Sequence, residues 1–185
     1  MKFLLKSREK LGYKLLNKKV AKVQRHKSYH NIESAKTIGV LFDSTIQANY
    51  FSARRFISYL TELGKNVSAL GMVINEEMLR YYTPCENIKL FSLEKLNFWC
   101  FPNNQEVDLF INKDFDILIN ICTSENLSAD YVLGLSISKF KVSIKYKQND
   151  FSDFALEFKD GRIPETDDLI DKIKLYLTSI KKSDK

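Results

Sequence analysis

Lysines recur at every fourth position near the start of the chain, from Lys6 to Lys22. Because an α-helix has about 3.6 residues per turn, lysines at this spacing form a slowly winding basic ridge on a helix. Ammonium groups on a helix surface bind nucleic-acid phosphates in a salt-sensitive way that is largely independent of base sequence. The pattern therefore favours contact with RNA. The candidate phosphate-binding residues are Lys6, Lys10, Lys14, Lys18, Lys19, Lys22 and Arg25.

Apolar residues accompany the lysines at near-helical spacing: Leu5, Leu16, Val20 and Val23. They predict an amphipathic helix from about residue 3 to 25, followed by a linker over residues 26–34. Such a helix is also typical of a segment that lies on an anionic membrane surface. A further alternative is a solvated basic face whose apolar stripe packs on the body or on a second copy of the chain, so a structural or homo-oligomeric role stays open.

Polar loops provide a second candidate site. One follows the apolar run that ends at Phe42, and the other follows the run that ends near Ile121. In an open parallel sheet, ligands bind beyond the carboxyl ends of the strands, and hydroxyl and N–H groups there suit an anion. The alternative is a set of ordinary helix caps and turn residues. The candidate ligand-binding residues are Asp43, Ser44, Thr45, Asn120, Thr123, Ser124 and Glu125.

Several chemistries lack the residues that they need. The six glycines form neither a dinucleotide-binding fingerprint nor a phosphate-binding loop. Both histidines, His26 and His30, precede the body, which leaves the body without a Ser-His or Cys-His pair. The three cysteines lack the spacing of a zinc cluster, and we expect reduced thiols, no metal ion and no cofactor. Carboxylate catalysis by Asp43 with Glu125 stays open, but the sequence leans against an enzyme.

Strands and helices alternate along the body, which predicts a Rossmann-like three-layer α/β domain with a mostly parallel sheet. We divide the chain into a basic helical arm with its linker, residues 1–34, and an α/β domain, residues 35–185. The expected strands cover residues 37–42, 66–74, 88–91, 115–121, 141–146 and, at the edge of the sheet, 154–158. Three helices are clearer than the others: one that ends at Leu63, one over residues 129–138 and one over residues 166–181. Ser44 or Thr45 is expected to cap the first helix of the body.

Charge is distributed unevenly along the 185 residues. Residues 1–36 hold eleven Lys or Arg and two Glu, a net charge of +9, whereas the whole chain carries +6 and the remainder therefore −3. The apolar run at the start is too short for a signal peptide or a transmembrane segment. These features predict a cytoplasmic protein with a basic helix on a mildly acidic body.

Three stretches resemble an uncharacterised family of cytoplasmic Bacteroidota proteins with a basic N-terminus. They are Thr37–Thr45, Gly64–Gly71 and Phe115–Val142, and the resemblance spans about residues 1–160. It implies no activity, but it does imply Asp at position 120 and Gly at position 143 in relatives, where this chain has Asn120 and Ser143. That departure puts a catalytic role of Asn120 in doubt.

The leading functional hypothesis is a non-enzymatic accessory or adaptor protein that contacts RNA or a ribonucleoprotein through the basic helix. The first alternative is a protein or enzyme that binds a nucleotide or sugar phosphate at the two polar loops. The second is a structural partner or oligomerisation module. A membrane surface ranks below RNA as the partner of the basic helix.

Overall fold

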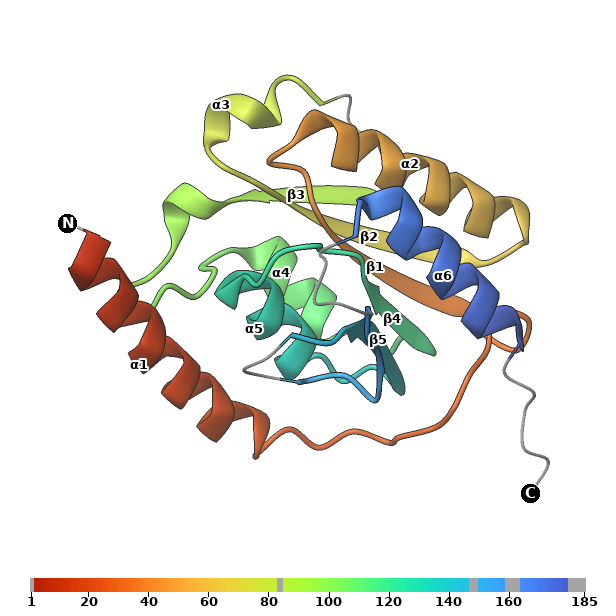
Figure 1. The fold of residues 1–185 in the computed structure, drawn as a ribbon, viewed down its shortest axis with the longest axis horizontal. Helices are drawn as coiled ribbons and strands as arrows, with labels where there is room; N and C mark the ends of the chain where they lie inside the picture. Colours follow the sequence, from red (N-terminus) through yellow and green to blue (C-terminus); the bar gives the residue numbers. More distant parts are fainter. Residues whose placement is uncertain (1, 83–84, 147–149, 159–163, 180–185) are drawn as a thin grey trace.

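A computed structural model gives the fold of the chain (Figure 1). It describes residues 2–82, 85–146, 150–158 and 164–179, with side chains from residue 6 onward. The chain forms a six-stranded sheet with helices on both faces, and one further helix precedes the first strand. This is the Rossmann-like three-layer α/β arrangement that the sequence predicts.

The sheet is parallel throughout, and its strands follow the order β3-β2-β1-β4-β5-β6. This order reverses between β1 and β4, which is the point where open α/β sheets bind ligands. Buried apolar residues fill β1, since a strand of a parallel sheet is covered on both faces. The strands are β1 Thr37–Asp43, β2 Asn66–Val73, β3 Ile88–Ser92, β4 Ile117–Asn120, β5 Phe140–Ile144 and β6 Phe154–Leu156.

Helices cover both faces of the sheet and divide the core into two clusters. The helices α2 and α6 bury one face of β1 with Val40 and Phe42, while α4 and α5 bury the other face with Leu41. No helix of the described residues is long and apolar enough to cross a membrane. The helices are α1 Lys2–Val20, α2 Gln47–Glu62, α3 Glu76–Leu79, α4 Gln105–Ile111, α5 Leu127–Leu135 and α6 Thr166–Ser179, with a short 3-10 turn at Leu93–Lys95.

Element boundaries differ from the prediction at two helix starts. Ser44 does not cap α2, because its hydroxyl donates to the carbonyl of Met72 at the end of β2, and α2 begins at Gln47 without a side-chain cap. Helix α5 begins two residues earlier than predicted, because the Asn126 side chain accepts hydrogen bonds from two backbone N–H groups of its first turn.

Helix α1 ends at Val20, five residues before the predicted end, and residues 24–36 run in extended or turn conformation along the amino ends of the strands (Figure 1). The backbone N–H groups of Ser28 and Ile32 donate to carbonyls before β5 and at the end of α6. The buried carboxylate of Asp116 accepts from the N–H groups of Lys36 and Thr37 and pairs with the Lys139 ammonium. The predicted linker is thus attached to the body at several points.

Candidate functional site

Helix α1 lies against α5 on the outer side of the domain (Figure 1). The Leu16 side chain is completely buried, in a cluster with Phe101 and Leu127. Gly12 allows the close approach, because a Cβ there would lie 2.5 Å from the carbonyl oxygen of Trp99. The apolar stripe of α1 is therefore used within the chain.

A buried polar contact joins the same two helices. The Tyr13 hydroxyl donates a hydrogen bond of 2.8 Å to the carboxylate of Asp130, whose residue is only 8% exposed. Burial raises the pKa of Asp130 to about 6, the negative charges of Glu125 and Asp150 add to the rise, and the hydrogen bond from Tyr13 opposes it. The charge of this carboxylate in the folded protein therefore changes around pH 6.

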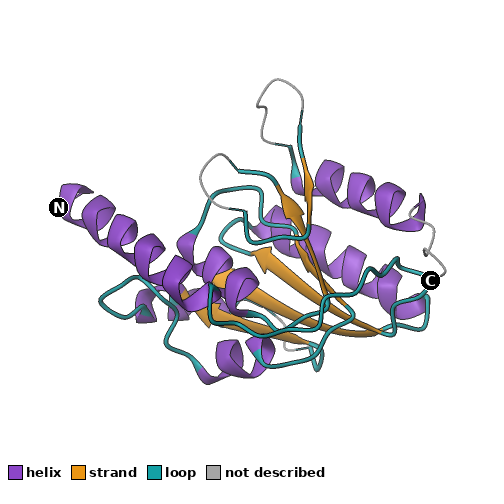
Figure 2. Ribbon diagram, turned by 90° about the horizontal axis from the view of Figure 1, so that it is seen from below, coloured by secondary structure: helices purple, strands orange, loops and turns teal. Residues whose placement is uncertain are grey.

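The lysines of the candidate set lie outside the buried contact between α1 and α5. All six lysines of the candidate set are exposed, and none of them makes a side-chain hydrogen bond or an ion pair within the part of the chain that the structure describes. Since Gly12 faces Leu127 at the start of α5, the first ten residues of α1 extend about 15 Å beyond that helix. Figure 2 shows this half of α1 projecting from the body.

Arg25 has a different environment from the lysines. Its guanidinium donates to the carbonyls of Ser138 and Lys139 and pairs with the carboxylate of Asp153. Its side chain is only 9% exposed. Arg25 therefore attaches the extended segment to the body and lies outside the exposed basic ridge.

A rigid aromatic loop flanks α1. The Asn97 side chain accepts hydrogen bonds from the N–H groups of Trp99 and Phe101, and Cys100 has a φ of 60°, which a residue with a side chain rarely adopts. Arg8 donates to the carbonyl of Phe98 and lies over its ring. The loop therefore holds Phe98 and Trp99 in solvent-exposed positions beside the helix.

A groove of about 950 Å³ lies between the projecting half of α1, the turn after β3 and the start of α5. Two lysines of the ladder line it together with Glu125 and Asn126 of the loop after β4. The structure thus brings residues of the two predicted sites to one place. The other lining residues are Glu9, Tyr13, Leu93, Leu96, Cys100, Leu127 and Ser128.

The residues of the predicted strand-end site have different environments. The Asp43 carboxylate accepts a hydrogen bond from the N–H of Thr45. Burial raises the pKa of Tyr146, and negative charges, those of Glu125 and Asp43 among them, add to the rise. The Tyr146 hydroxyl donates to the carbonyl of Cys122. Thr123 is half-exposed, and Ser124 is exposed.

Two other residues of that set are buried and bonded within the protein. The Asn120 side chain donates to the Ser143 hydroxyl and accepts from the N–H of Cys122. The Ser44 carbonyl accepts from the Tyr82 hydroxyl, in addition to the hydrogen bond that the Ser44 hydroxyl donates to β2. Both side chains use their hydrogen-bonding groups to hold the loops in place.

Cys122, two residues after the end of β4, is only 1% exposed. Burial, and then the charges of Asp43 and Asp130, raise the pKa of this thiol well above its ordinary value. A thiol in such an environment stays protonated and is a poor nucleophile. Among the described residues, no group of three or more His, Cys, Asp or Glu side chains is arranged to hold a metal ion.

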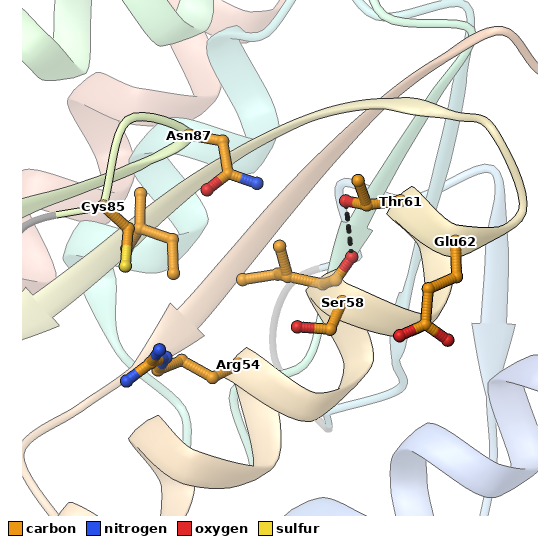
Figure 3. Close-up of a pocket in the computed structure, with 8 residues that line it drawn as sticks. Arg54, Ser58, Thr61, Glu62, Cys85 and Asn87 are labelled. Atoms are coloured by element: carbon orange, nitrogen blue, oxygen red, sulfur yellow. Dashed lines mark hydrogen bonds between the residues drawn. The ribbon is translucent and has the colours of Figure 1, made fainter.

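A hollow of about 340 Å³ lies between α2 and the turn before β3, and Figure 3 shows the residues that line it. Arg54 and Glu62 lie on its α2 side and carry opposite charges, and the Thr61 hydroxyl donates to the carbonyl of Ile57. The end of α2 and the start of β3 lie at the amino edge of the sheet, opposite the edge where ligands of parallel sheets bind.

Asp130 and the aromatic loop are the parts of this region that sequence reasoning missed. Asp130 is the one acidic residue in an otherwise apolar helix, which is a signal that a buried carboxylate has a partner. The loop offers a weaker signal, because adjacent Phe and Trp between Asn97 and Cys100 are also compatible with the core.

A family of unknown function (DUF6913) matches residues 8–180, which include most of α1 and the whole sheet. No curated protein and no solved structure matches the chain.

The raised pKa of Asp130 predicts the pH dependence of stability. The folded protein holds this proton more tightly than the unfolded chain, in which an Asp has a pKa of about 3.9. The contribution of Asp130 to stability is therefore favourable at low pH and is lost as the pH rises from about 4 to 6. We expect Asp130→Asn, which can still accept from Tyr13, to raise the free energy of unfolding by up to about 2 kcal/mol at pH 7.5 and by almost nothing at pH 4.

Urea unfolding at the two pH values measures this difference. Asp171→Asn is the matched control, because Asp171 is exposed on α6 and its loss should change stability by less than about 0.5 kcal/mol. An Asp130→Asn variant that is less stable than the wild type at pH 7.5 would show that the ionised carboxylate stabilises the contact between α1 and α5.

Proposed function

The chain belongs to the family of unknown function DUF6913, and from the geometry of α1 we propose that it is a non-enzymatic accessory protein that contacts RNA or a ribonucleoprotein through that helix. The observation that carries the proposal is the set of five exposed lysines on α1, with a sixth, Lys22, in the turn after it, none of which has an ion-pair partner among the described residues. The other face of this helix is docked on the body. We also propose, in line with the sequence, that the protein acts in the cytoplasm of a member of the Bacteroidota.

Electrostatics support RNA as the partner. The ladder from Lys6 to Lys18 is about 18 Å long, with successive ammonium groups about 6 Å apart along the axis. No carboxylate of the described residues pairs with these lysines, so phosphates would not have to displace an internal partner. The mildly acidic remainder of the chain would favour an approach of RNA to the α1 side.

The docking of α1 argues against the two alternatives that need its apolar stripe. A membrane-surface helix inserts its apolar face into the bilayer interface. In this chain Leu16 of that face is fully buried against α5, and Tyr13 is hydrogen-bonded to Asp130. Insertion into a membrane, or packing of the stripe on a second copy, would therefore require α1 to leave the body.

Replacement of four ladder lysines by glutamine, Lys6, Lys10, Lys14 and Lys18 together, tests the proposal in the full-length protein. Single strands release about 0.7 counterion per neutralised phosphate, so the slope of log affinity against log salt should become shallower by about 3. Fluorescence anisotropy with a labelled single-stranded RNA between 50 and 300 mM salt (about sixfold in concentration) measures both affinity and slope.

A control variant with Gln at Lys36, Lys89, Lys145 and Lys172 has the same net charge, and these four lysines are exposed elsewhere on the surface. We expect it to bind almost as the wild type does. Equal loss in both variants would mean that net charge alone drives binding. Unchanged RNA affinity of the ladder variant, or binding only to vesicles that contain phosphatidylserine, would contradict the proposal.

A second candidate function is the binding of a nucleotide or sugar phosphate beyond β1 and β4, favoured by the reversal of strand order between these strands. The Asp43 carboxylate would accept hydrogen bonds from sugar hydroxyls, and Thr123 and Ser124 would donate to phosphate oxygens.

Thermal-shift measurements with nucleotides and sugar phosphates test this second candidate. A ligand at 100 times its Kd stabilises a protein by about 2.7 kcal/mol, which raises Tm by several degrees. We expect Asp43→Ala to remove such a shift. Identical responses of Asp43→Ala and the wild type to every compound would exclude Asp43 from a ligand site.

A further inference from the structure

The basic ladder leads into the groove beside α5. Lys6 and Lys10 are the first two lysines of the ladder and also line the groove, whereas Lys14 and Lys18 continue along the outside of the helix. An RNA backbone that follows the ladder toward the start of α1 therefore arrives at the groove. This continuity is a property of the helix, because residues four apart lie on neighbouring parts of its surface.

The lining of the groove separates into three chemical types. Lys6 and Lys10 supply positive charge, three leucines and Tyr13 supply apolar surface, and Glu9 and Glu125 supply carboxylates. The two carboxylates make no side-chain hydrogen bond or ion pair with other residues that the structure describes. The volume of about 950 Å³ is at the upper end of the range of sites that enclose small molecules.

We infer that the groove accepts one unstacked base of a single-stranded RNA whose backbone phosphates contact Lys6 and Lys10. This inference rests on the proposed function, because the ladder delivers the strand. The base would pack against Tyr13 and the leucine side chains, as unpaired bases do on aromatic and apolar surfaces. A base within a duplex would not enter, because its edge is paired and both its faces are stacked.

The carboxylates select among the bases. A carboxylate only accepts hydrogen bonds, so it matches the exocyclic amino groups of cytosine, adenine and guanine. Uracil has no exocyclic amino group, and its one donor on that edge, N3–H, lies between two carbonyl oxygens that a carboxylate repels. The groove should therefore prefer bases with an exocyclic amino group over uracil.

Binding of four labelled probes to the full-length protein tests the inference. The probes are single-stranded oligomers of C, A and U, each of about ten nucleotides, and an RNA duplex of about ten base pairs. We expect the C and A oligomers to bind about fivefold more tightly than the U oligomer, and the duplex to bind more weakly than the C oligomer at equal salt. Glu125→Gln should reduce the preference for C over U to about twofold or less. Glu62→Gln, an exposed change of the same type on α2, should leave it unchanged.

The outcomes separate this inference from the proposed function. Equal affinity for the C, A and U oligomers, or duplex affinity equal to that of the C oligomer, would overturn base binding in the groove while the ladder variant could still lose RNA affinity. Unchanged affinity of the ladder variant would overturn both. The comparison of oligomers uses the wild-type protein, so it decides the inference even if Glu125→Gln fails to fold.

Discussion

The contact between α1 and α5 is the constraint on which the surface of this protein depends. Leu16 is buried in the contact, Gly12 permits it, and the hydrogen bond from Tyr13 to Asp130 fixes the rotation of α1 about its own axis. Once this rotation is fixed, the four-residue spacing of the lysines keeps their side chains out of the buried contact and exposed. The basic ridge is therefore a consequence of packing as much as of composition.

The same contact determines which charges meet at the groove. Lys6 and Lys10 line it together with Glu9 and Glu125, Lys14 and Lys18 are not among its lining residues, and Asp130 is buried where α1 packs on α5. A polyanion would be attracted to the outer face and repelled from the inner carboxylates, and only an uncharged part of it, a base, would fit beneath the helix. This arrangement gives RNA a direction of approach and does not require the apolar stripe to leave α5.

The fold could be predicted from the sequence where a single physical signal dominated. Buried strands such as β1 are short apolar runs, and α6 has a clean helical period, so both were located to within a few residues. The order of the strands could not be predicted, because every buried parallel strand looks alike along the chain. The early end of α1 also escaped prediction, because the pattern of Lys22 and Val23 continues the helical period although the chain becomes extended there.

The candidate sites could be predicted only in part, because a sequence gives residue types but not their partners. The six candidate lysines are exposed, as an amphipathic helix implies, yet Arg25, from the same candidate set, is engaged by carbonyls far away in the sequence. Asn120 has the residue type of a ligand but is bonded to Ser143, its neighbour on β5. Asp130 gave only the indirect signal of one acidic residue in an apolar helix, because its importance comes from burial by α1.

The most direct test of the account is an NMR titration of the full-length protein with a single-stranded C oligomer at low salt, following backbone amide shifts. The account predicts that the largest shifts fall on residues 6–18 of α1 and on residues 125–128 at the start of α5, with α2 and α6 almost unchanged. Shifts concentrated at the amino edge of the sheet or on α2, or the absence of shifts at saturating RNA, would contradict it.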